Sequence, residues 1–598
     1  MAHGSGQRRP ARLILTTTAA LCLAAIAMAG PDALLRPGTV AQVYAARDRQ
    51  AIWVAGPELT AQARGLLTWI AAVEADGLDP ADYHLPELHG LLAMVARGGE
   101  PVWADAEAAH RAEYLLTDAF LAVGHDLALG RVDPAVLWKN WSPAVQHADV
   151  LARLQATLTR MPAARAGERT AAADSLIADL TACRPAHAEY QALRQVMVDL
   201  AGITAVGGWP TVDAGRALHP GDRDQRSPQL RARLMATGAL ARPTPAPAAP
   251  WQQGGDPLLF DEPLAAAVRA FQRSHGLDAD GVVGARTLAA LNVTAAARAA
   301  QVALNLERWR WQPQQLGRRH IRVNIPDYSL AVIADGAPEL TMRAIVGRPD
   351  RPTPVLSSAV SGLVLNPRWN VPQKLAREDL LPKLAADPGY LAERGIRVFR
   401  DWRPGSPEID PATVDWSTIV PGDLAYKFQQ EAGPRNPLGR IKFTFPNEYA
   451  VYIHDTDQRG AFARERRCLS SGCVRVEDPQ GLLAALVPDG SPLDTVLQAA
   501  LGDAATSALA LPSRLPVHLM YLTAWIDAGG GLQLRDDCYG YDLELAAALA
   551  ARRGTPVPVP PADPLLVAWS TLPAAADPGP VHQVRTGPVS MWTNPGPE

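Results

Sequence analysis

The spacing of apolar residues changes along this chain from a helical period to a strand period, and this change limits the fold more than any other feature. The stretch LTAQARGLLTWIAAVEADGL places apolar side chains on one helical face: Leu59, Ala63, Leu66, Leu67, Ile70 and Val73. A second stretch, AHRAEYLLTDAFLAVGHDLALG, repeats the pattern before Gly130. A helical scaffold domain is therefore predicted over residues 39–238.

From His320 onward every second residue tends to be apolar, as in HIRVNIPDYSLAVIADG, which predicts strands. The alternation stops at QKLAREDLLPKLAADPGYLAERG and resumes at AYKFQQ. An insertion of about 50 residues beside a site is often a lid, so a mostly helical lid is predicted over 373–424. The chain of 598 residues is thus predicted to be a multidomain α+β protein with a β-rich domain over 318–545.

Composition excludes two classes of protein. Hydrophobic residues make up 48% of the chain and charged residues 20%, which is typical of globular domains rather than of fibres. There are 61 acidic and 57 basic residues, a net charge of −4, and no long basic stripe. Nucleic acid is therefore not expected as a partner.

The first 29 residues are typical of an export signal. Arg8, Arg9 and Arg12 precede a mostly apolar run over 13–29, which ends in the small-x-small pattern Ala27-Met28-Ala29. Cleavage after Ala29 is expected, and an uncleaved anchor in the inner membrane is the alternative. Either outcome predicts a periplasmic or cell-envelope location.

Two boundaries follow from composition. The Pro/Ala/Gly-rich segment 239–257 is predicted to be a linker, and the compact helical pattern over 258–295 a small domain. The Pro/Ala-rich segment 552–598 is predicted to be a disordered tail.

The cysteines include a candidate nucleophile. With Cys22 inside the signal, the remaining cysteines are Cys183, Cys468, Cys473 and Cys538. A mature protein of more than 500 residues has no need of a disulfide framework, and the spacing of these cysteines is not that of a zinc site. In an oxidising compartment a free thiol is retained for a reason, so at least one is a candidate nucleophile.

His454 stands nineteen residues before Cys473, which is flanked by Ser471, Gly472 and Arg475. A working thiol needs a base or a cation nearby, and neighbouring strands could bring the imidazole to the sulfur. Gly472 permits a sharp turn whose amide could face an oxyanion, and Arg475 could bind a carboxylate. The alternative is a hairpin with a buried thiol and an exposed histidine.

The residues AVRAFQ, HGL, DGVVG and TLAALN within 258–295 resemble the type 1 peptidoglycan-binding domain, which is a three-helix unit. HDT followed by SSGCVR resembles the HxT…SxGCxR signature of the L,D-transpeptidase (YkuD-type) catalytic domain. The residues SSGCVRV also resemble the large periplasmic YcbB-like branch of that family. Supporting resemblances are NPRW at 366–369, NPLG at 436–439 and AWIDAGGGLQLRDDCYGYD.

This resemblance implies a mechanism. Cys473 would attack the carbonyl between diaminopimelate and D-Ala of a tetrapeptide stem, release D-Ala, and pass the acyl group from a thioester to a second stem in a 3→3 crosslink. His454 would act as base and then acid, oriented by the backbone carbonyl of Asp455. The resemblance assigns substrate contacts to Arg475, Ser471, Tyr452 and Trp369. It implies no metal and no organic cofactor.

The same resemblance implies peptidoglycan stems as donor and acceptor, carbapenems as acylating agents of Cys473, and other cell-wall enzymes as partners. An L,D-carboxypeptidase, in which water replaces the acceptor amine, is one alternative. A non-catalytic peptidoglycan-binding protein is another, although it would not need His454, Cys473 and Arg475 together. A redox protein would be expected to have a CxxC pair, which the sequence lacks. Cys468 has no assigned role: it is either inert or part of a regulatory disulfide.

Overall fold

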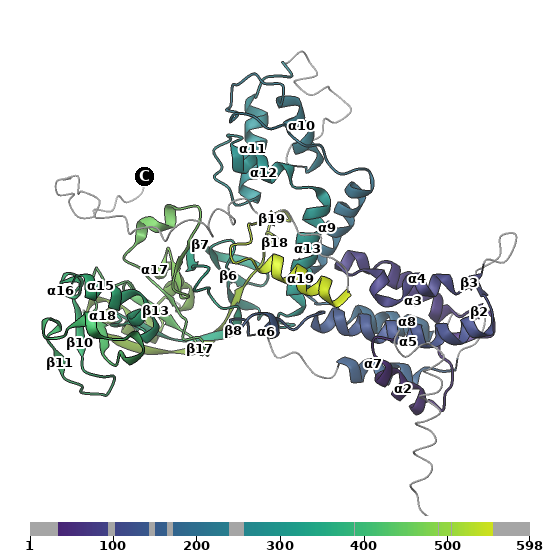
Figure 1. Cartoon of the computed structure of the whole chain (residues 1–598), viewed down its shortest axis with the longest axis horizontal. Helices are drawn as coiled ribbons and strands as arrows, with labels where there is room; N and C mark the ends of the chain where they lie inside the picture. The colour runs from purple at the N-terminus through teal and green to yellow at the C-terminus, as the bar shows by residue number, and fades with distance from the viewer. Residues whose placement is uncertain are drawn as a thin grey trace, which may run out of the picture.

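The computed structural model describes residues 34–93, 102–142, 150–163, 171–238, 256–387, 389–487, 489–503 and 505–553. The predicted leader over 1–29, nearly all of the linker over 239–257 and nearly all of the tail over 552–598 lie outside these residues. The α+β prediction is confirmed, because a helical amino-terminal region and a β-rich region lie on opposite sides of the molecule (Figure 1).

The amino-terminal region packs helices around α5 (Ala106–Leu129), whose side chains are buried on almost every face. The Asp105 side chain caps this helix by accepting from the Ala108 amide at 2.7 Å. Four short strands, β1 (Val54–Ala55), β2 (Glu58–Leu59), β3 (Leu92–Ala93) and β4 (Val102–Trp103), form a small sheet among the described residues. The other helices are α2 (Pro37–Ala46), α3 (Ala61–Ala71), α4 (Leu85–Gly90), α6 (Pro134–Leu137), α7 (Val150–Arg160), α8 (Ala171–Thr181) and α9 (Ala188–Ala205).

Three helices form a separate unit that projects away from the rest of the molecule (Figure 1): α10 (Ser227–Ala236), α11 (Glu262–Ser274) and α12 (Ala285–Asn292). Leu230 and Leu234 of α10 share one core with Phe260, Leu264 and Val268. The structure therefore differs from the predicted boundary at residue 238, because α10 belongs with the unit predicted over 258–295. A helix this short is stabilised by burying its apolar face against neighbours, and α11 provides that surface.

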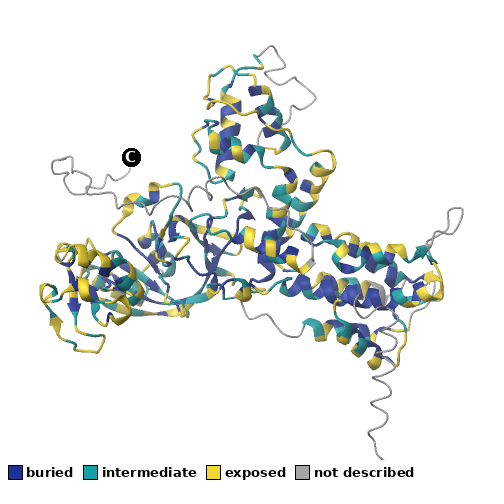
Figure 2. Ribbon diagram, in the orientation of Figure 1, coloured by how far each residue is buried: buried dark blue, intermediate teal, exposed yellow. Residues whose placement is uncertain are grey.

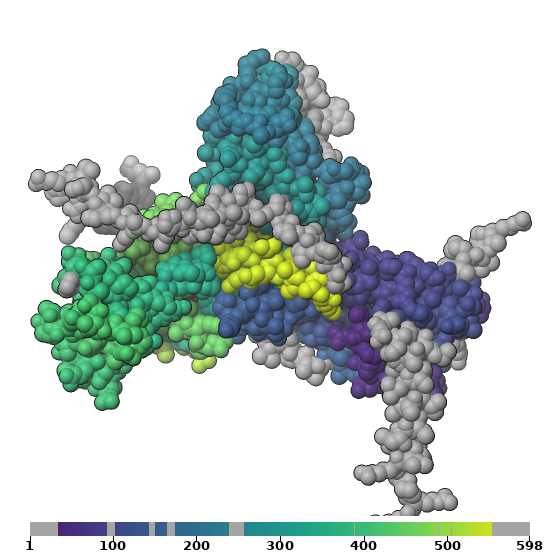
Figure 3. All heavy atoms as spheres, in the orientation of Figure 1, coloured from purple at the N-terminus to yellow at the C-terminus, as the bar shows by residue number. Residues whose placement is uncertain are grey.

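Helix α13 (Ala295–Arg310) connects this unit to the β-rich region and packs along α9. Helix α19 (Tyr541–Arg553) lies along the junction between the helical and β-rich regions (Figure 3). Its Tyr541, Leu545 and Leu549 share a core with Trp138 and Trp311. Figure 2 shows that buried residues concentrate at this junction and inside the sheet.

The β domain is built on one sheet in which nine strands are described, in the order β15-β7-β16-β14-β13-β8-β17-β5-β6. Because β6 also pairs with β7, the sheet closes on itself around an apolar core. The strands are β5 (Arg319–Asn324), β6 (Ser329–Ala334), β7 (Ala337–Gly347), β8 (Leu356–Leu365), β13 (Ile441–Thr444), β14 (Ile453–His454), β15 (Cys468–Ser470), β16 (Val474–Val476) and β17 (Ser507–Met520). Helices α17 (Pro479–Leu486) and α18 (Pro492–Gly502) add leucines to its core, and β18 (Ala524–Ile526) and β19 (Leu532–Leu534) form a hairpin.

The predicted lid is a lobe with its own core around Leu384, Val398 and Trp416. Its helices are α14 (Gln373–Leu375), a π-helical turn (Ala376–Leu380), α15 (Leu381–Ala386) and α16 (Tyr390–Arg394). Its sheet, in the order β11-β10-β12-β9, extends past both predicted ends because β9 (Trp369–Asn370) and β12 (Lys427–Gln430) pair across its base. The other two strands are β10 (Ile396–Phe399) and β11 (Glu408–Ile409). We call residues 369–430 the lid lobe.

No helix among the described residues is both long and apolar enough to cross a membrane. In the same residues, no group of three or more His, Cys, Asp or Glu side chains is placed to hold a metal ion. The four cysteines within the described ranges, Cys183, Cys468, Cys473 and Cys538, are all free thiols.

Candidate active site

Strands β14 and β16 lie side by side and run parallel, with Ile453 opposite Val474 and His454 opposite Arg475. Cys473 comes directly before β16, so the histidine and the thiol lie on neighbouring segments, and both line the same cavity. A parallel pair requires a crossover connection, which residues 455–473 supply. The hairpin alternative is therefore wrong, and His454 is only 4% exposed rather than on the surface.

His454 is held by its own strand end. Its Nδ1 lies 2.5 Å from the backbone carbonyl oxygen of Asp455, which is the contact expected to orient the ring. Burial lowers the pKa of His454 to about 3, the positive charge of Arg475 acts in the same direction, and the hydrogen bond to Asp455 opposes both. The imidazole is therefore neutral at physiological pH.

The Asp455 side chain anchors this turn, a role that the sequence did not indicate. Its Oδ2 accepts from the Arg440 amide at 2.8 Å, and its Oδ1 accepts from the Thr456 amide at 2.7 Å and from Arg459 Nη2 at 2.5 Å. These bonds fix the backbone whose carbonyl contacts His454. Gly439 is required beside it, because a Cβ there would stand 2.3 Å from the Asp455 carboxyl carbon.

The Cys473 thiol is half-buried, and burial raises its pKa. Hydrogen bonds with Tyr452 and the positive charges of Lys442 and Arg475 act in the opposite direction without reversing the shift. Within the described residues no hydrogen bond joins this thiol to the His454 imidazole, which interacts with the carbonyls of Asp455 and Pro437. The resting pair is thus a thiol beside a neutral imidazole.

The turn before the nucleophile is closed by Ser470. Its Oγ accepts from the Gly472 amide at 3.2 Å and donates to the Cys473 carbonyl at 2.6 Å, while Thr353 Oγ1 donates to the Gly472 carbonyl at 2.8 Å. Gly472 has φ +115°, a conformation that glycine adopts readily. In this structure the Gly472 amide donates to Ser470 Oγ, and its oxyanion role stays a prediction.

Arg475 and Ser471 face the site in different ways. Arg475 Nη1 donates to Gln458 Oε1 at 3.0 Å, and burial lowers the pKa of the guanidinium. Its Nε is buried and makes no hydrogen bond within the described part of the chain, which favours an anionic ligand there. Ser471 is exposed, with its Oγ 3.3 Å from Arg351 Nη1.

A cavity of about 870 Å³ lies between the β domain and the lid lobe. Pro437, Leu438 and Arg351 line it together with lid residues such as Asp379 and Lys383. Seven of the eight predicted site residues contribute to its wall: Trp369, Tyr452, His454, Ser471, Gly472, Cys473 and Arg475. Asp455 is absent from this wall and acts on the site only through His454.

Two basic residues of the site were missed by the sequence reasoning. Lys442 pairs with His454 across β13 and β14, and its Nζ lies 3.8 Å from the centre of the Tyr452 ring. Arg351 joins Ser471 to the lid carboxylates Glu378 and Asp379. A lysine inside the strand pattern IKFTF is the signal that could have identified Lys442.

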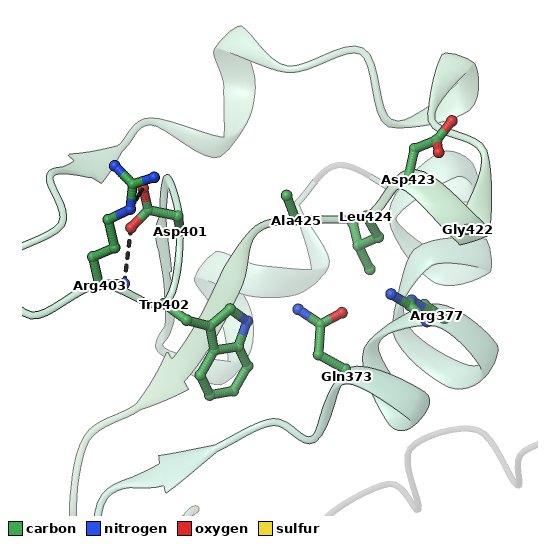
Figure 4. Close-up of a pocket in the computed structure, with 9 residues that line it drawn as sticks. All are labelled: Gln373, Arg377, Asp401, Trp402, Arg403, Gly422, Asp423, Leu424 and Ala425. Carbon is green, nitrogen blue, oxygen red and sulfur yellow. Dashed lines mark hydrogen bonds and ion pairs between the residues drawn. The ribbon is translucent and has the colours of Figure 1, made fainter.

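A second hollow, of about 590 Å³, lies on the lid lobe (Figure 4). Its lining residues include Gln373, Arg377, Trp402 and Asp423, and none of the predicted site residues reaches it. Gln373 and Arg377 are one helical turn apart, whereas Leu375, Asp379 and Leu380 line the cavity at Cys473. The same segment therefore separates the two hollows.

Three family models match successive parts of the chain. The model described as "Scaffold domain" matches residues 38–197, the "Putative peptidoglycan binding domain" matches 252–291, and the "L,D-transpeptidase catalytic domain" matches 318–495. A curated protein of Haemophilus influenzae named "Putative L,D-transpeptidase" is 40% identical over 248 residues, 42% of this chain and 49% of that protein. The chain thus spans about half the length of this relative.

Solved structures also match at low similarity. An L,D-transpeptidase from Xylanimonas cellulosilytica is 15% identical, with 51% of this chain and 98% of that chain covered and a TM-score of 0.17. An L,D-transpeptidase from Stackebrandtia nassauensis is 15% identical, with 52% and 96% covered and a TM-score of 0.19. TM-scores this low do not bear on how the parts of the present chain are arranged.

Proposed function

Because this chain carries an L,D-transpeptidase catalytic domain, we propose that it is a peptidoglycan L,D-transpeptidase that forms 3→3 crosslinks between stem peptides. The observation that supports the proposal is that His454, at the end of β14, and Cys473, directly before the neighbouring parallel strand β16, line one cavity. The domain matched over 252–291 supports peptidoglycan as the substrate and the cell envelope as the location.

The proposed reaction begins with the neutral pair. As the Cys473 sulfur attacks the carbonyl between diaminopimelate and D-Ala, its proton passes to His454, and the new C–S bond gives a tetrahedral intermediate. His454 then protonates the leaving D-Ala amine, and a thioester remains. The side-chain amine of a second stem attacks this thioester, restores the thiol and completes the crosslink.

Arg475 and Lys442 are proposed to supply the positive charge of the site. The unpartnered Arg475 Nε suits a donor carboxylate, since charge-assisted hydrogen bonds are the stronger ones. Lys442 lowers the pKa of Cys473 and would favour the thiolate as it develops. Tyr452, Ser471 and Trp369 line the space in which the stem would lie.

The test is to incubate the purified chain with tetrapeptide muropeptides, using wild type, Cys473→Ala and Cys183→Ala, and to separate and sequence the products. A dimer that has lost one D-Ala, formed by wild type and Cys183→Ala but not by Cys473→Ala, supports the proposal. Tripeptide without dimer would show a carboxypeptidase instead. Dimer formation by Cys473→Ala would contradict the assignment of the nucleophile.

A carbapenem gives an independent test of the thiol. We expect intact-mass measurement to show one acyl adduct on wild type and none on Cys473→Ala. An adduct that persists in Cys473→Ala would place the reactive group elsewhere.

A further inference from the structure

Two cysteines outside the mechanism are neighbours in space. Cys468 begins β15, and Cys538 lies in the loop before α19, yet both belong to the apolar cluster around Tyr521 and Val346. The two thiols are neighbours within this cluster, and each shifts the pKa of the other. Each also meets a tyrosine hydroxyl: Tyr328 lies 2.9 Å from Cys468 Sγ, and Tyr521 lies 3.7 Å from Cys538 Sγ.

We infer that Cys468 and Cys538 are a redox pair that closes to an internal disulfide bond, a modification that is independent of the acyl-transfer chemistry at Cys473. Because both side chains belong to one cluster, closing the bond requires the two sulfur atoms to move together to the bonding distance of about 2.05 Å. The oxidant is a disulfide of the surroundings, small-molecule or protein-bound, acting by thiol–disulfide exchange.

The two sulfurs are suited to different steps. The neighbouring Cys538 thiol and the Tyr328 hydroxyl lower the pKa of Cys468, and burial raises the pKa of Cys538. Cys468 is half-buried and Cys538 is 1% exposed, so an outside disulfide meets Cys468 first.

The step balances as two exchanges. The Cys468 thiolate attacks the oxidant, forms a mixed disulfide and expels one thiolate; Cys538 then attacks the Cys468 sulfur, loses its proton and expels the second. Two electrons and two protons leave the pair, and one disulfide of the oxidant becomes two thiols.

The Cys468–Cys538 disulfide would stabilise the turn that precedes Cys473. Cys468 starts the strand that leads to Gly472 and Cys473, and Cys538 precedes Tyr539, whose hydroxyl donates to the Gly347 carbonyl at 2.6 Å. The same hydroxyl accepts from the Thr353 amide at 3.2 Å, and Thr353 holds the Gly472 carbonyl. Oxidation would thus join covalently two segments that already meet through Thr353.

The test is to treat the full-length wild-type chain with oxidised glutathione, alkylate it under denaturing conditions without reductant, and map the peptides. We expect one linked pair, Cys468–Cys538, with a loss of about 2 Da for the two hydrogens removed, while Cys183 and Cys473 are alkylated. Dithiothreitol should restore alkylation at both sites. Alkylation of both Cys468 and Cys538, or a Cys468–Cys473 link, would overturn the inference.

Two cysteine variants test the same inference. Cys538→Ser should trap one glutathione on Cys468, whereas Cys183→Ser, the matched control at another buried thiol, should oxidise as wild type does. A wild-type chain that retains glutathione on Cys468 without closing the link would also overturn the inference. Since the readout is mass rather than turnover, failure here is distinguishable from failure of the proposed transpeptidase activity.

Discussion

At the scale of single residues, burial and nearby positive charges determine the protonation states of His454 and Cys473. Burial lowers the pKa of His454 to about 3 and raises the pKa of Cys473, so both groups rest in their neutral forms. A free histidine would instead gain its proton as the pH falls through about 6.5. The site is therefore expected to lack the pH response typical of an exposed histidine.

The pH dependence of Cys473 alkylation tests this. Because the pKa of His454 is lowered, acidification to about pH 5 leaves the imidazole neutral, and the rate should show no inflection near pH 6.5. Because the pKa of Cys473 is raised, the rate should climb only in the alkaline range. The rate is measured by intact mass after timed exposure to iodoacetamide, and an inflection near pH 6.5 would contradict the burial argument.

Lys442→Met extends the same experiment. The substitution removes a positive charge that lowers the pKa of Cys473, so the alkaline rise should move to higher pH. Lys427→Met, on β12 of the lid lobe, is the control and should leave the curve in place. Equal curves for all three chains would show that Lys442 does not act on the thiol.

Gly472→Ala tests the backbone of the nucleophile turn. A Cβ would meet Pro352 and Val451 only at ordinary contact distances of 3.7 and 3.8 Å, so the cost comes from the φ of +115°. We expect about 1–2 kcal/mol less stability on urea unfolding. Gly460→Ala, where φ is not positive and no atom lies within 4 Å of the added carbon, is the control. A loss no larger than that of the control would contradict the assigned strain.

At the scale of secondary-structure elements, the lid lobe is fastened to the β domain by Arg351. Its Nη2 lies 2.6 Å from Glu378 Oε2 and 2.7 Å from Asp379 Oδ1, and its side chain is 8% exposed. The acceptors lie on the π-helical turn Ala376–Leu380, a feature that often marks a functional position in a helix. Since Arg351 also reaches Ser471, one guanidinium connects the lid to the nucleophile turn.

Arg351→Met should loosen this connection. We expect amide hydrogen exchange over 376–386 to become several-fold faster, with little change in β8 or β17, because the lid loses a largely buried charged partner. The KM for tetrapeptide should rise more than kcat falls if the lid mainly holds the substrate. Arg397→Met, which removes the exposed ion pairs of Arg397 with Glu408 and Glu431, is the control. Unchanged exchange over 376–386 would show that the lobe does not depend on Arg351.

At the scale of the whole molecule, α13 joins the helical and β-rich regions through buried charges. Glu307 is fully buried, and its Oε2 lies 3.1 Å from Arg131 Nε and also pairs with Arg310. Burial raises the pKa of Glu307, but the positive charges of Arg131 and Arg310 outweigh this and lower it overall. The carboxylate is thus the shared partner of two arginines at the junction.

Glu307→Gln keeps the shape of the side chain and removes its charge. Arg131 and Arg310 then lose the buried negative charge that they share, and we expect a loss of about 3 kcal/mol or more, seen as a lower urea midpoint by tryptophan fluorescence. Asp335→Asn breaks the exposed Arg318–Asp335 pair and should leave the midpoint in place, since exposed pairs contribute little. Equal midpoints for both variants would contradict a role for Glu307 at the junction.

The sequence by itself determined the features that depend on local pattern. The spacing of apolar residues distinguished the helical from the β-rich regions, and the residues around His454 and Cys473 identified the candidate site. Both signals depend only on residues that are close together in the chain. The limits of the three-helix unit and of the lid sheet were less accurate, since α10 and β9 are fixed by partners beyond the predicted boundaries.

Only the tertiary structure decided which distant side chains meet. The pairing of β14 with β16, the approach of Lys442 to Tyr452, and the direction of the Gly472 amide follow from strand register and burial. The contact of Cys468 with Cys538 likewise depends on the closed sheet and the segment before α19, 70 residues apart in the chain. Such contacts arise from the packing of the whole domain, so no local stretch of sequence contains them.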